Sequence, residues 1–110
     1  MASTLKSTIT PGVSAEATVY SPASSPVTTA TIIGILIANN GDGPGAQLVT
    51  VRLQRGAASA NIIKGVLVPA GDTFVPSGFE GKIVMMAGDN LRVSTNIGTV
   101  DVTVSYLEQT

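Results

Sequence analysis

The chain has 110 residues, with no cysteine, histidine or tryptophan, and six basic and seven acidic residues give a net charge of −1. The absence of cysteine excludes disulfides, iron–sulfur clusters and thiolate zinc sites, and the absence of a basic patch argues against binding to a nucleic-acid backbone. Charged residues are only 12% of the chain, about half the roughly 25% of an average soluble domain. We therefore expect part of the surface to be covered by another copy, in a homo-oligomer.

The first 26 residues differ in composition from the rest, because 17 of them are Ser, Thr, Ala or Pro. We predict a Ser/Thr/Pro-rich N-terminal arm over 1–26 and a β-sandwich domain over 27–110. Two β-compatible patches, Leu5 to Thr10 and Ala15 to Tyr20, leave open the alternative of ordinary N-terminal strands. No apolar segment follows the N-terminus, so neither a signal peptide nor a membrane segment is expected.

The segment Val27 to Ala38 is strand-like and apolar on both faces. Simple alternation predicts Ile33, Ile35 and Ile37 on one face and Ile32, Leu36 and Ala38 on the other. A strand that is apolar on both faces is covered on two sides, by the core and by a neighbour. The candidate interface residues are Ile32 and Leu36 from this strand and Leu5, Ile9 and Tyr20 from the N-terminal segment.

A glycine-rich loop, Asn39 to Gly45, follows this strand. Its three glycines do not open a helix, and Thr50 stands where a calcium loop needs a glutamate, so neither a phosphate site nor a calcium site is predicted. The later strands are predicted at 47–55, 61–68, 73–75, 82–86, 91–95 and 100–106. Short strands with frequent turns, about seven to nine in all, are typical of an antiparallel β-sandwich or jelly roll.

Two corners share the phrase Ala-Gly-Asp, at Ala70-Gly71-Asp72 and Ala87-Gly88-Asp89. Glycine in a tight turn supplies a backbone conformation that other residues adopt poorly, and the adjacent aspartate can bond to local backbone. Gly71 and Gly88 are therefore predicted to be structural turn residues.

No catalytic, cofactor or metal site is predicted. Most of the seven acidic residues lie at turns or chain ends, and no base, nucleophile or metal ligand accompanies them. Sugar binding is a more serious alternative, but it needs exposed aromatic platforms. Tyr106 and Phe74 fall on apolar registers, which leaves Phe79 as the one ring expected to be exposed.

The stretch from about Thr31 to Glu108 resembles small β-sandwich structural proteins of tailed bacteriophages. The matching phrases are 34–39 (GILIAN), 49–53 (VTVRL), 66–71 (VLVPAG), 86–94 (MAGDNLRVS) and 101–108 (DVTVSYLE). The resemblance implies a non-enzymatic virion protein without cofactors, made in the host cytoplasm. It implies a capsid cement protein that braces neighbouring subunits of the major capsid protein, and we expect a trimer. The alternatives are a neck or tail component, or a glycan- or receptor-binding module.

Overall fold

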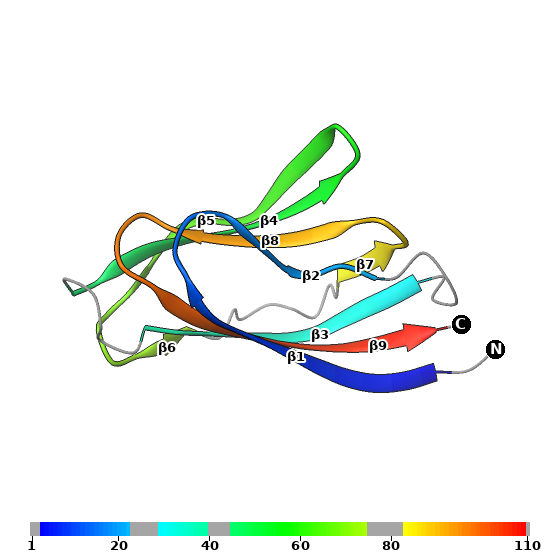
Figure 1. The fold of residues 1–110 in the computed structure, drawn as a ribbon, viewed down its shortest axis with the longest axis horizontal. Helices are drawn as coiled ribbons and strands as arrows, with labels where there is room; N and C mark the ends of the chain where they lie inside the picture. Colours follow the sequence, from blue (N-terminus) through cyan, green and yellow to red (C-terminus); the bar gives the residue numbers. More distant parts are fainter. Residues whose placement is uncertain (1–2, 23–28, 40–44, 75–82, 110) are drawn as a thin grey trace.

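The computed structural model describes residues 3–22, 29–39, 45–74 and 83–109 of the chain. These residues form nine strands in two sheets, with β1, β9 and β3 in the lower layer of Figure 1 and β2, β8 and β4 in the upper layer. The strands are β1 (Ser3–Val13), β2 (Ala17–Tyr20), β3 (Thr29–Ala38), β4 (Gln47–Arg55), β5 (Ala58–Val68), β6 (Thr73–Phe74), β7 (Ile83–Met86), β8 (Asn90–Thr95) and β9 (Val100–Gln109). The predicted all-β sandwich is confirmed. Within the described ranges, no helix has the length and hydropathy needed to cross a membrane.

The strand pairing is nested along the chain. β1 pairs with β9, β2 with β8, β3 with β7 and β4 with β5, all antiparallel. The five-stranded sheet has the order β1-β9-β3, with β6 and β7 both beside β3, and the four-stranded sheet has the order β2-β8-β4-β5. Antiparallel pairs that are nested in this way and divided between two sheets have the topology of a jelly roll.

The core lies between the two sheets and consists mainly of valine and isoleucine. In β9 the buried side chains alternate, with Val100, Val102, Val104 and Tyr106 facing inward. From the opposite sheet, Val49, Val51, Leu91 and Val93 pack against the same core. Small β-branched side chains suit this position because they pack well on a pleated, half-buried surface.

β3 departs from the simple alternation predicted for it. Ile32, Ile35 and Ile37 are buried, whereas Ile33 and Leu36 face outward. The cause is a register shift between Ile32 and Gly34 opposite β9, where Ile33 is the extra residue. A bulge of this kind places two residues of one strand opposite one of its partner and changes the face of everything beyond it. The prediction that Ile33 shares a face with Ile35 and Ile37, and Ile32 with Leu36, was therefore wrong.

The N-terminal segment contributes one edge strand to each sheet. β1 pairs with β9 from Ser3 to Thr10 without a register shift, and β2 pairs with β8. Val13, Val19 and Tyr20 belong to the buried core. The proposed boundary at residue 26 lies outside the described residues, and the division into an arm and a sandwich domain stays a prediction.

The two Ala-Gly-Asp corners have the same backbone geometry. At the first corner the Asp72 N–H donates to the Pro69 carbonyl at 3.1 Å and Gly71 has φ 81°. At the second, the Asp89 N–H donates to the Met86 carbonyl at 3.0 Å and Gly88 has φ 88°. A four-residue turn with a positive φ at its third position favours glycine there, as β-turns of types II and I′ do.

We expect the substitutions Gly71→Val and Gly88→Val each to destabilise the protein by about 1 to 3 kcal/mol, the cost of holding a side chain in this region. A Cβ would meet no atom within 4 Å at either position, so the cost comes from the backbone alone. Each kcal/mol lowers the melting temperature of a domain of this size by roughly 4 to 8 °C. Gly34→Ala is the matched control, since Gly34 has equal space and no positive φ. Equal melting temperatures for all three variants would contradict the prediction.

Candidate interaction surface

The outer face of the five-stranded sheet is almost free of charge. The outward residues of β9 are Asp101, Thr103, Ser105, Leu107 and Gln109. Cross-strand pairing aligns Leu5, Leu107, Thr31 and Val84 in one row across β1, β9, β3 and β7. A second row aligns Ile9, Thr103 and Leu36. Among the described outward residues of these strands, only Asp101 carries a charge, and its carboxylate accepts a bond from the Gly12 N–H at 2.9 Å.

Large apolar side chains are exposed on this face. The exposed fractions are 70% for Leu5, 74% for Ile9, 43% for Ile33, 44% for Leu36, 53% for Val84 and 46% for Met86. These six residues and the polar residues between them are called the neutral face below. Scattered exposed leucines are ordinary, but a set aligned on one sheet face is typical of an interaction surface.

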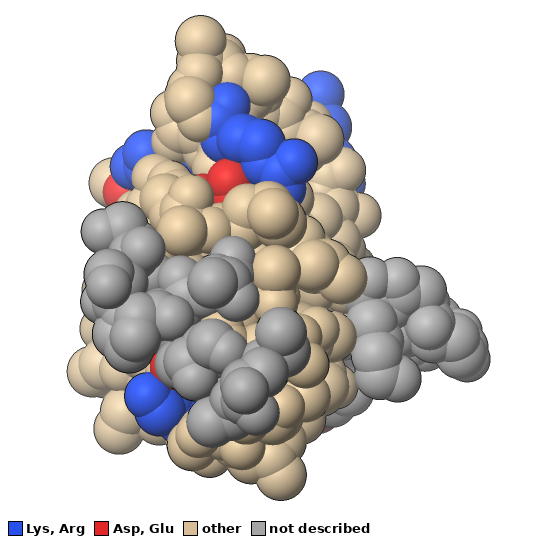
Figure 2. All heavy atoms as spheres, turned by 90° about the vertical axis from the view of Figure 1, so that its right-hand side faces the viewer, with Lys and Arg blue, Asp and Glu red and all other residues tan. Residues whose placement is uncertain are grey.

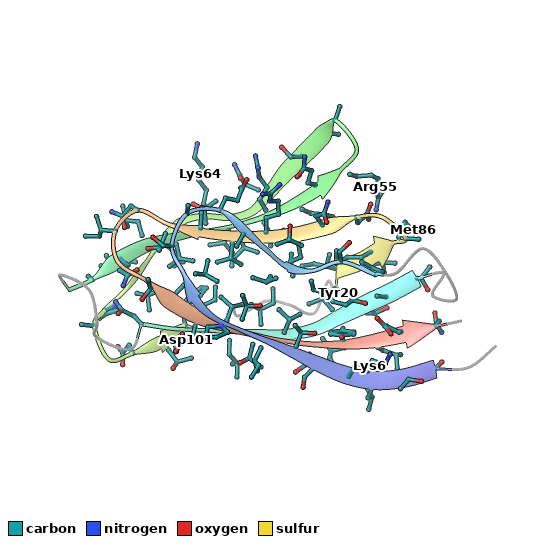
Figure 3. The ribbon with its side chains drawn as sticks, in the orientation of Figure 1. Lys6, Tyr20, Arg55, Lys64, Met86 and Asp101 are labelled. Carbon is teal, nitrogen blue, oxygen red and sulfur yellow. The ribbon has the colours of Figure 1, made fainter. Side chains whose placement is uncertain are left out.

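The outer face of the four-stranded sheet is different, because it carries a cluster of charges. Arg52 and Arg92 lie directly opposite each other on β4 and β8, and Glu16 pairs with both. Lys64 projects from β5, away from the body of the molecule (Figure 3). In the view of Figure 2 most of the visible Lys and Arg atoms also lie toward the β4–β5 side. The same sheet has one exposed apolar pair, Leu48 and Leu67.

The five candidate interface residues are divided between two environments. Leu5, Ile9 and Leu36 lie together on the neutral face. Ile32 and Tyr20 are buried between the sheets, at 0% and 7% exposure, so we do not retain them as candidates for an interface. Val84 and Met86 were missed. The four residues of β7 are all apolar, so the sequence does not show which of them face outward, and only the pairing of β7 with β3 places Val84 and Met86 on this face.

A buried carboxylate holds β1, β2 and β9 together at one end of the sandwich. Glu108 accepts a bond from the Tyr20 hydroxyl at 2.6 Å and pairs with the Lys6 ammonium at 2.8 Å. The Lys6 ammonium and the Tyr20 hydroxyl hold the pKa of Glu108 below its usual range. Burial, followed by the bond to Glu108, raises the pKa of Tyr20. Figure 3 shows Lys6 and Tyr20 on the two sheets that this contact joins.

A second buried carboxylate belongs to the second corner. Asp89 is bound through both oxygens by Arg55, with contacts from 2.7 to 3.1 Å, and accepts the Met86 N–H at 2.9 Å. The bond from Arg55 holds the pKa of Asp89 below its usual value. Both buried carboxylates are therefore ionised partners of cations and have structural roles. In the described residues no three His, Cys, Asp or Glu side chains gather as metal ligands would.

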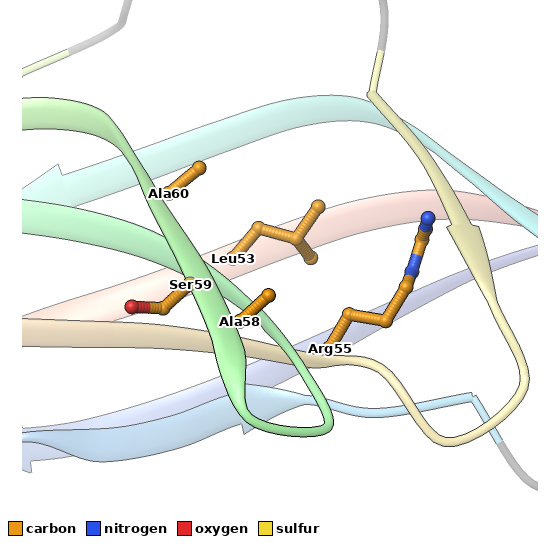
Figure 4. Close-up of a pocket in the computed structure, with 5 residues that line it drawn as sticks. All are labelled: Leu53, Arg55, Ala58, Ser59 and Ala60. Carbon is orange, nitrogen blue, oxygen red and sulfur yellow. The ribbon is translucent and has the colours of Figure 1, made fainter.

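The hairpin of β4 and β5 forms a shallow pocket of about 230 Å³. Figure 4 shows its lining, which is Leu53, Arg55, Ala58, Ser59 and Ala60. The Arg55 guanidinium is already bound to Asp89, so the pocket offers methyl groups and one hydroxyl. We assign no chemistry to it.

The aromatic side chains do not form a sugar platform in the described part of the chain. Tyr20 and Tyr106 stack on each other inside the sandwich, with ring centroids 3.9 Å apart. Phe74 packs against the core. Phe79, the ring predicted to be exposed, lies outside the described residues.

No protein-family model and no curated protein matches the chain. Among solved structures, two crystal structures of a pentameric capsid protein isolated from metagenomic phage sequences are similar to it, each with a TM-score of 0.48 and 11% identity. The alignments cover 88% of this chain and 59% and 60% of those chains. The chain thus spans less than two thirds of the length of these neighbours.

Proposed function

We propose that this chain is a non-enzymatic structural protein of a tailed-phage virion, and that it acts as a capsid cement protein. The observation that carries the proposal is the neutral face, a sheet surface with six exposed large apolar side chains and no basic residue in its described part. The resemblance of the sequence to small phage structural proteins supports the same role. The jelly-roll topology agrees with it by analogy, since viral capsid domains use this fold, but so do lectins.

The size of the neutral face fits a specific interface. β9 has ten residues and, with β1, β3 and β7, spans a sheet four strands wide. At about 3.3 Å per residue and 4.8 Å per strand, three strands of about ten residues and the four residues of β7 give a flat area of roughly 540 Å², before the relief of the side chains is counted. Stable interfaces bury about 800 Å² per partner, and their centres are poor in charge. The neutral face therefore has the composition of one side of such an interface, and the relief of its side chains brings its area toward the lower end of the size range.

The partners we propose are other copies of the chain and the major capsid protein. A symmetric homo-oligomer, expected to be a trimer, would cover apolar area that a monomer leaves in water. Copies on the capsid surface would then brace neighbouring capsid subunits. The charged face of the four-stranded sheet would remain in solvent, since Arg52, Arg92 and Glu16 leave a net charge of +1 there that is costly to bury.

The copy number in a purified particle tests the cement role. A cement protein is expected at a number comparable with that of the major capsid protein, measured by quantitative mass spectrometry of intact virions. A number near the symmetry of the tail would instead indicate the neck or tail alternative. A protein that copurifies with no particle would leave the glycan- or receptor-binding alternative, to be followed by glycan-array binding.

Leu36→Lys tests the neutral face directly. Because Leu36 is 44% exposed, the variant is expected to fold normally but to lose association, since a charge at the centre of an apolar contact is costly to desolvate. The measurement is mass by light scattering together with the melting temperature. Leu67→Lys is the matched control on the other sheet, where Leu67 is 58% exposed. If both variants associate like the parent, or if Leu67→Lys alone dissociates, the neutral face is not the interface.

A further inference from the structure

β1 is one of two long edge strands in the described part of the chain, with eleven residues like β5. It lies at the end of the five-stranded sheet, and in the described part of the chain it pairs with β9 alone. Its pairing runs through eight consecutive residues, from Ser3 to Thr10, before a register shift. The opposite side of these residues presents backbone N–H donors and C=O acceptors that pair with no described strand. Such an edge is a template for pairing with another strand.

The other edges of the sandwich are protected in the ways that natural sheets use. β2, β6 and β7 have only four, two and four residues. β5 is long, but its pairing with β4 has two register shifts, and it carries Lys64 and Gly65 with φ 67°. Short strands, bulges and lysines all discourage edge-to-edge pairing. β1 lacks the bulge over Ser3 to Thr10, and its lysine is neutralised by Glu108 at 2.8 Å.

β1 also carries the two most exposed large apolar side chains of the described residues. Leu5 is 70% exposed and Ile9 is 74% exposed, and both follow the outward register of the strand. They are separated by three residues with Ser7 at the centre, so the outward pattern Leu-x-Ser-x-Ile is nearly symmetric about Ser7. An antiparallel copy of the same strand, centred on Ser7, would place each Leu5 opposite the other copy's Ile9.

We propose that β1 pairs antiparallel with β1 of a second copy of this chain, across a two-fold axis beside Ser7. Each Leu5 then lies opposite Ile9 of the other copy, and the two Ser7 residues lie opposite each other. Each Lys6 lies opposite Thr8 of the other copy rather than opposite the other lysine. Aliphatic cross-strand pairs of this kind stabilise antiparallel sheets, and like charges directly opposite would oppose them. Pairing ends naturally after Thr10, because Pro11 has no N–H to donate.

The other even registers fit less well. Centring the pair on Leu5 sets Ile9 opposite Met1, outside the strand. Centring it on Ile9 sets Ser7 opposite Pro11. An odd register would place outward residues opposite inward ones, which breaks the alternation of the sheet. Among the remaining even registers, centring the pair on Lys6 sets the two lysines opposite each other, and centring it on Thr8 sets Leu5 opposite Pro11. Only the Ser7 register sets Leu5 opposite Ile9.

The inference deepens the proposed function, because it names one contact through which copies associate and continues the neutral face from one copy into the next. It does not depend on the trimer. In solution the contact gives a closed pair, and in a trimer it would link neighbouring oligomers, since an isologous contact closes on itself.

A cysteine cross-link tests the pairing, and the chain is suited to it because it contains no native cysteine. In the Ser7 register the two Ser7 Cα atoms lie about 4.5 to 5.5 Å apart, within the range of about 4.4 to 6.8 Å that a disulfide spans. Ser7→Cys is therefore expected to convert most of the protein to a covalent dimer under mild oxidation, read on a non-reducing gel. Circular dichroism before oxidation establishes that the variant is folded.

Ser105→Cys is the matched control, because Ser105 pairs with Ser7 on the neighbouring strand and the same face. Across the proposed axis the two Ser105 residues are roughly three strand spacings apart, about 14 Å, and should stay monomeric on the gel. Dimers from both variants would indicate face-to-face packing and overturn the edge pairing. No dimer from folded Ser7→Cys would also overturn it. The proposed function would survive either result if the wild-type protein associates and is abundant in particles.

Discussion

Replacing Ile32 by alanine is expected to destabilise the protein by about 2 to 5 kcal/mol, whereas the same change at Ile33 is expected to cost less than about 1 kcal/mol. Ile32 is completely buried, and Ile33 beside it is 43% exposed. The truncation at Ile32 leaves a cavity between the sheets, whose rigid surroundings relax only in part. In melting temperature the loss at Ile32 corresponds to at least about 8 °C.

The pair Ile35→Ala and Leu36→Ala serves as the control beyond the bulge. Ile35 is 1% exposed and Leu36 is 44% exposed, so Ile35→Ala should destabilise the protein more than Leu36→Ala. Melting curves at low protein concentration separate folding from association on the neutral face. If Ile33→Ala were the more damaging variant and Ile32→Ala the milder one, β3 would have the regular register and the bulge would be absent.

Local patterns in the sequence are enough to predict the sandwich. In β9, apolar residues alternate with polar ones, and this alternation predicts which face is buried. The structure confirms it, with Val100, Val102, Val104 and Tyr106 facing inward. Such alternation requires only that one face be apolar and the other polar. The two glycine corners could likewise be located from a few neighbouring residues, and in the structure each of them is a β-turn between two strands.

The bulge in β3 could not be predicted in the same way. Ile32 and Ile33 are both isoleucine, so either one satisfies the inner face, and the apolar run is compatible with two registers. The choice depends on how β3 pairs with β9, where Tyr106 and Ser105 face Ile32 and Gly34. That pairing joins residues far apart in the sequence, and a short-range pattern does not contain it.

The neutral face could be predicted in part for the same reason. Leu36, Leu5 and Ile9 were expected at an interface from excess apolar character, and they do lie together on one face. Their assembly with Val84 and Met86 depends on the order of strands in the sheet. The burial of Glu108 could not be predicted, since a carboxylate near a chain end is ordinarily solvated. Its burial depends on Lys6 and Tyr20, whose bonds to it join residues 102 and 88 positions apart.

Glu108→Ala is the second variant with a large expected effect, because it removes the acceptor that the buried Tyr20 hydroxyl uses at 2.6 Å. A buried donor left without a partner costs about 1 to 3 kcal/mol, or a fall in melting temperature of roughly 4 °C or more. Lys6 adds little to this cost, since its side chain is 50% exposed and water can replace the carboxylate. Glu108→Gln retains an acceptor for Tyr20 and should be less damaging at neutral pH.

The pH dependence of stability separates the contribution of the Glu108 charge from the contribution of its packing. A carboxyl group whose pKa is lowered by folding stabilises the protein fully above its unfolded pKa, about 4.3, and that contribution is lost as the pH falls through the folded pKa. Asp89, lowered by Arg55, acts in the same direction. Wild-type protein is therefore expected to melt at a constant temperature near neutral pH and at falling temperatures below about pH 4.5.

In Glu108→Gln the Glu108 part of this loss should be absent, because the amide does not titrate. The melting temperatures of the two proteins should differ most at neutral pH and converge as the wild-type carboxyl becomes protonated in acid. Lys6→Gln provides the complementary control. Without the ammonium that chiefly lowers the pKa of Glu108, the folded and unfolded pKa values lie closer together, so the decline should start at the same pH but be smaller and level off at a higher pH. Parallel curves for all three proteins would mean that folding does not shift the pKa of Glu108, and that Glu108 makes no ionised contact that stabilises the folded state.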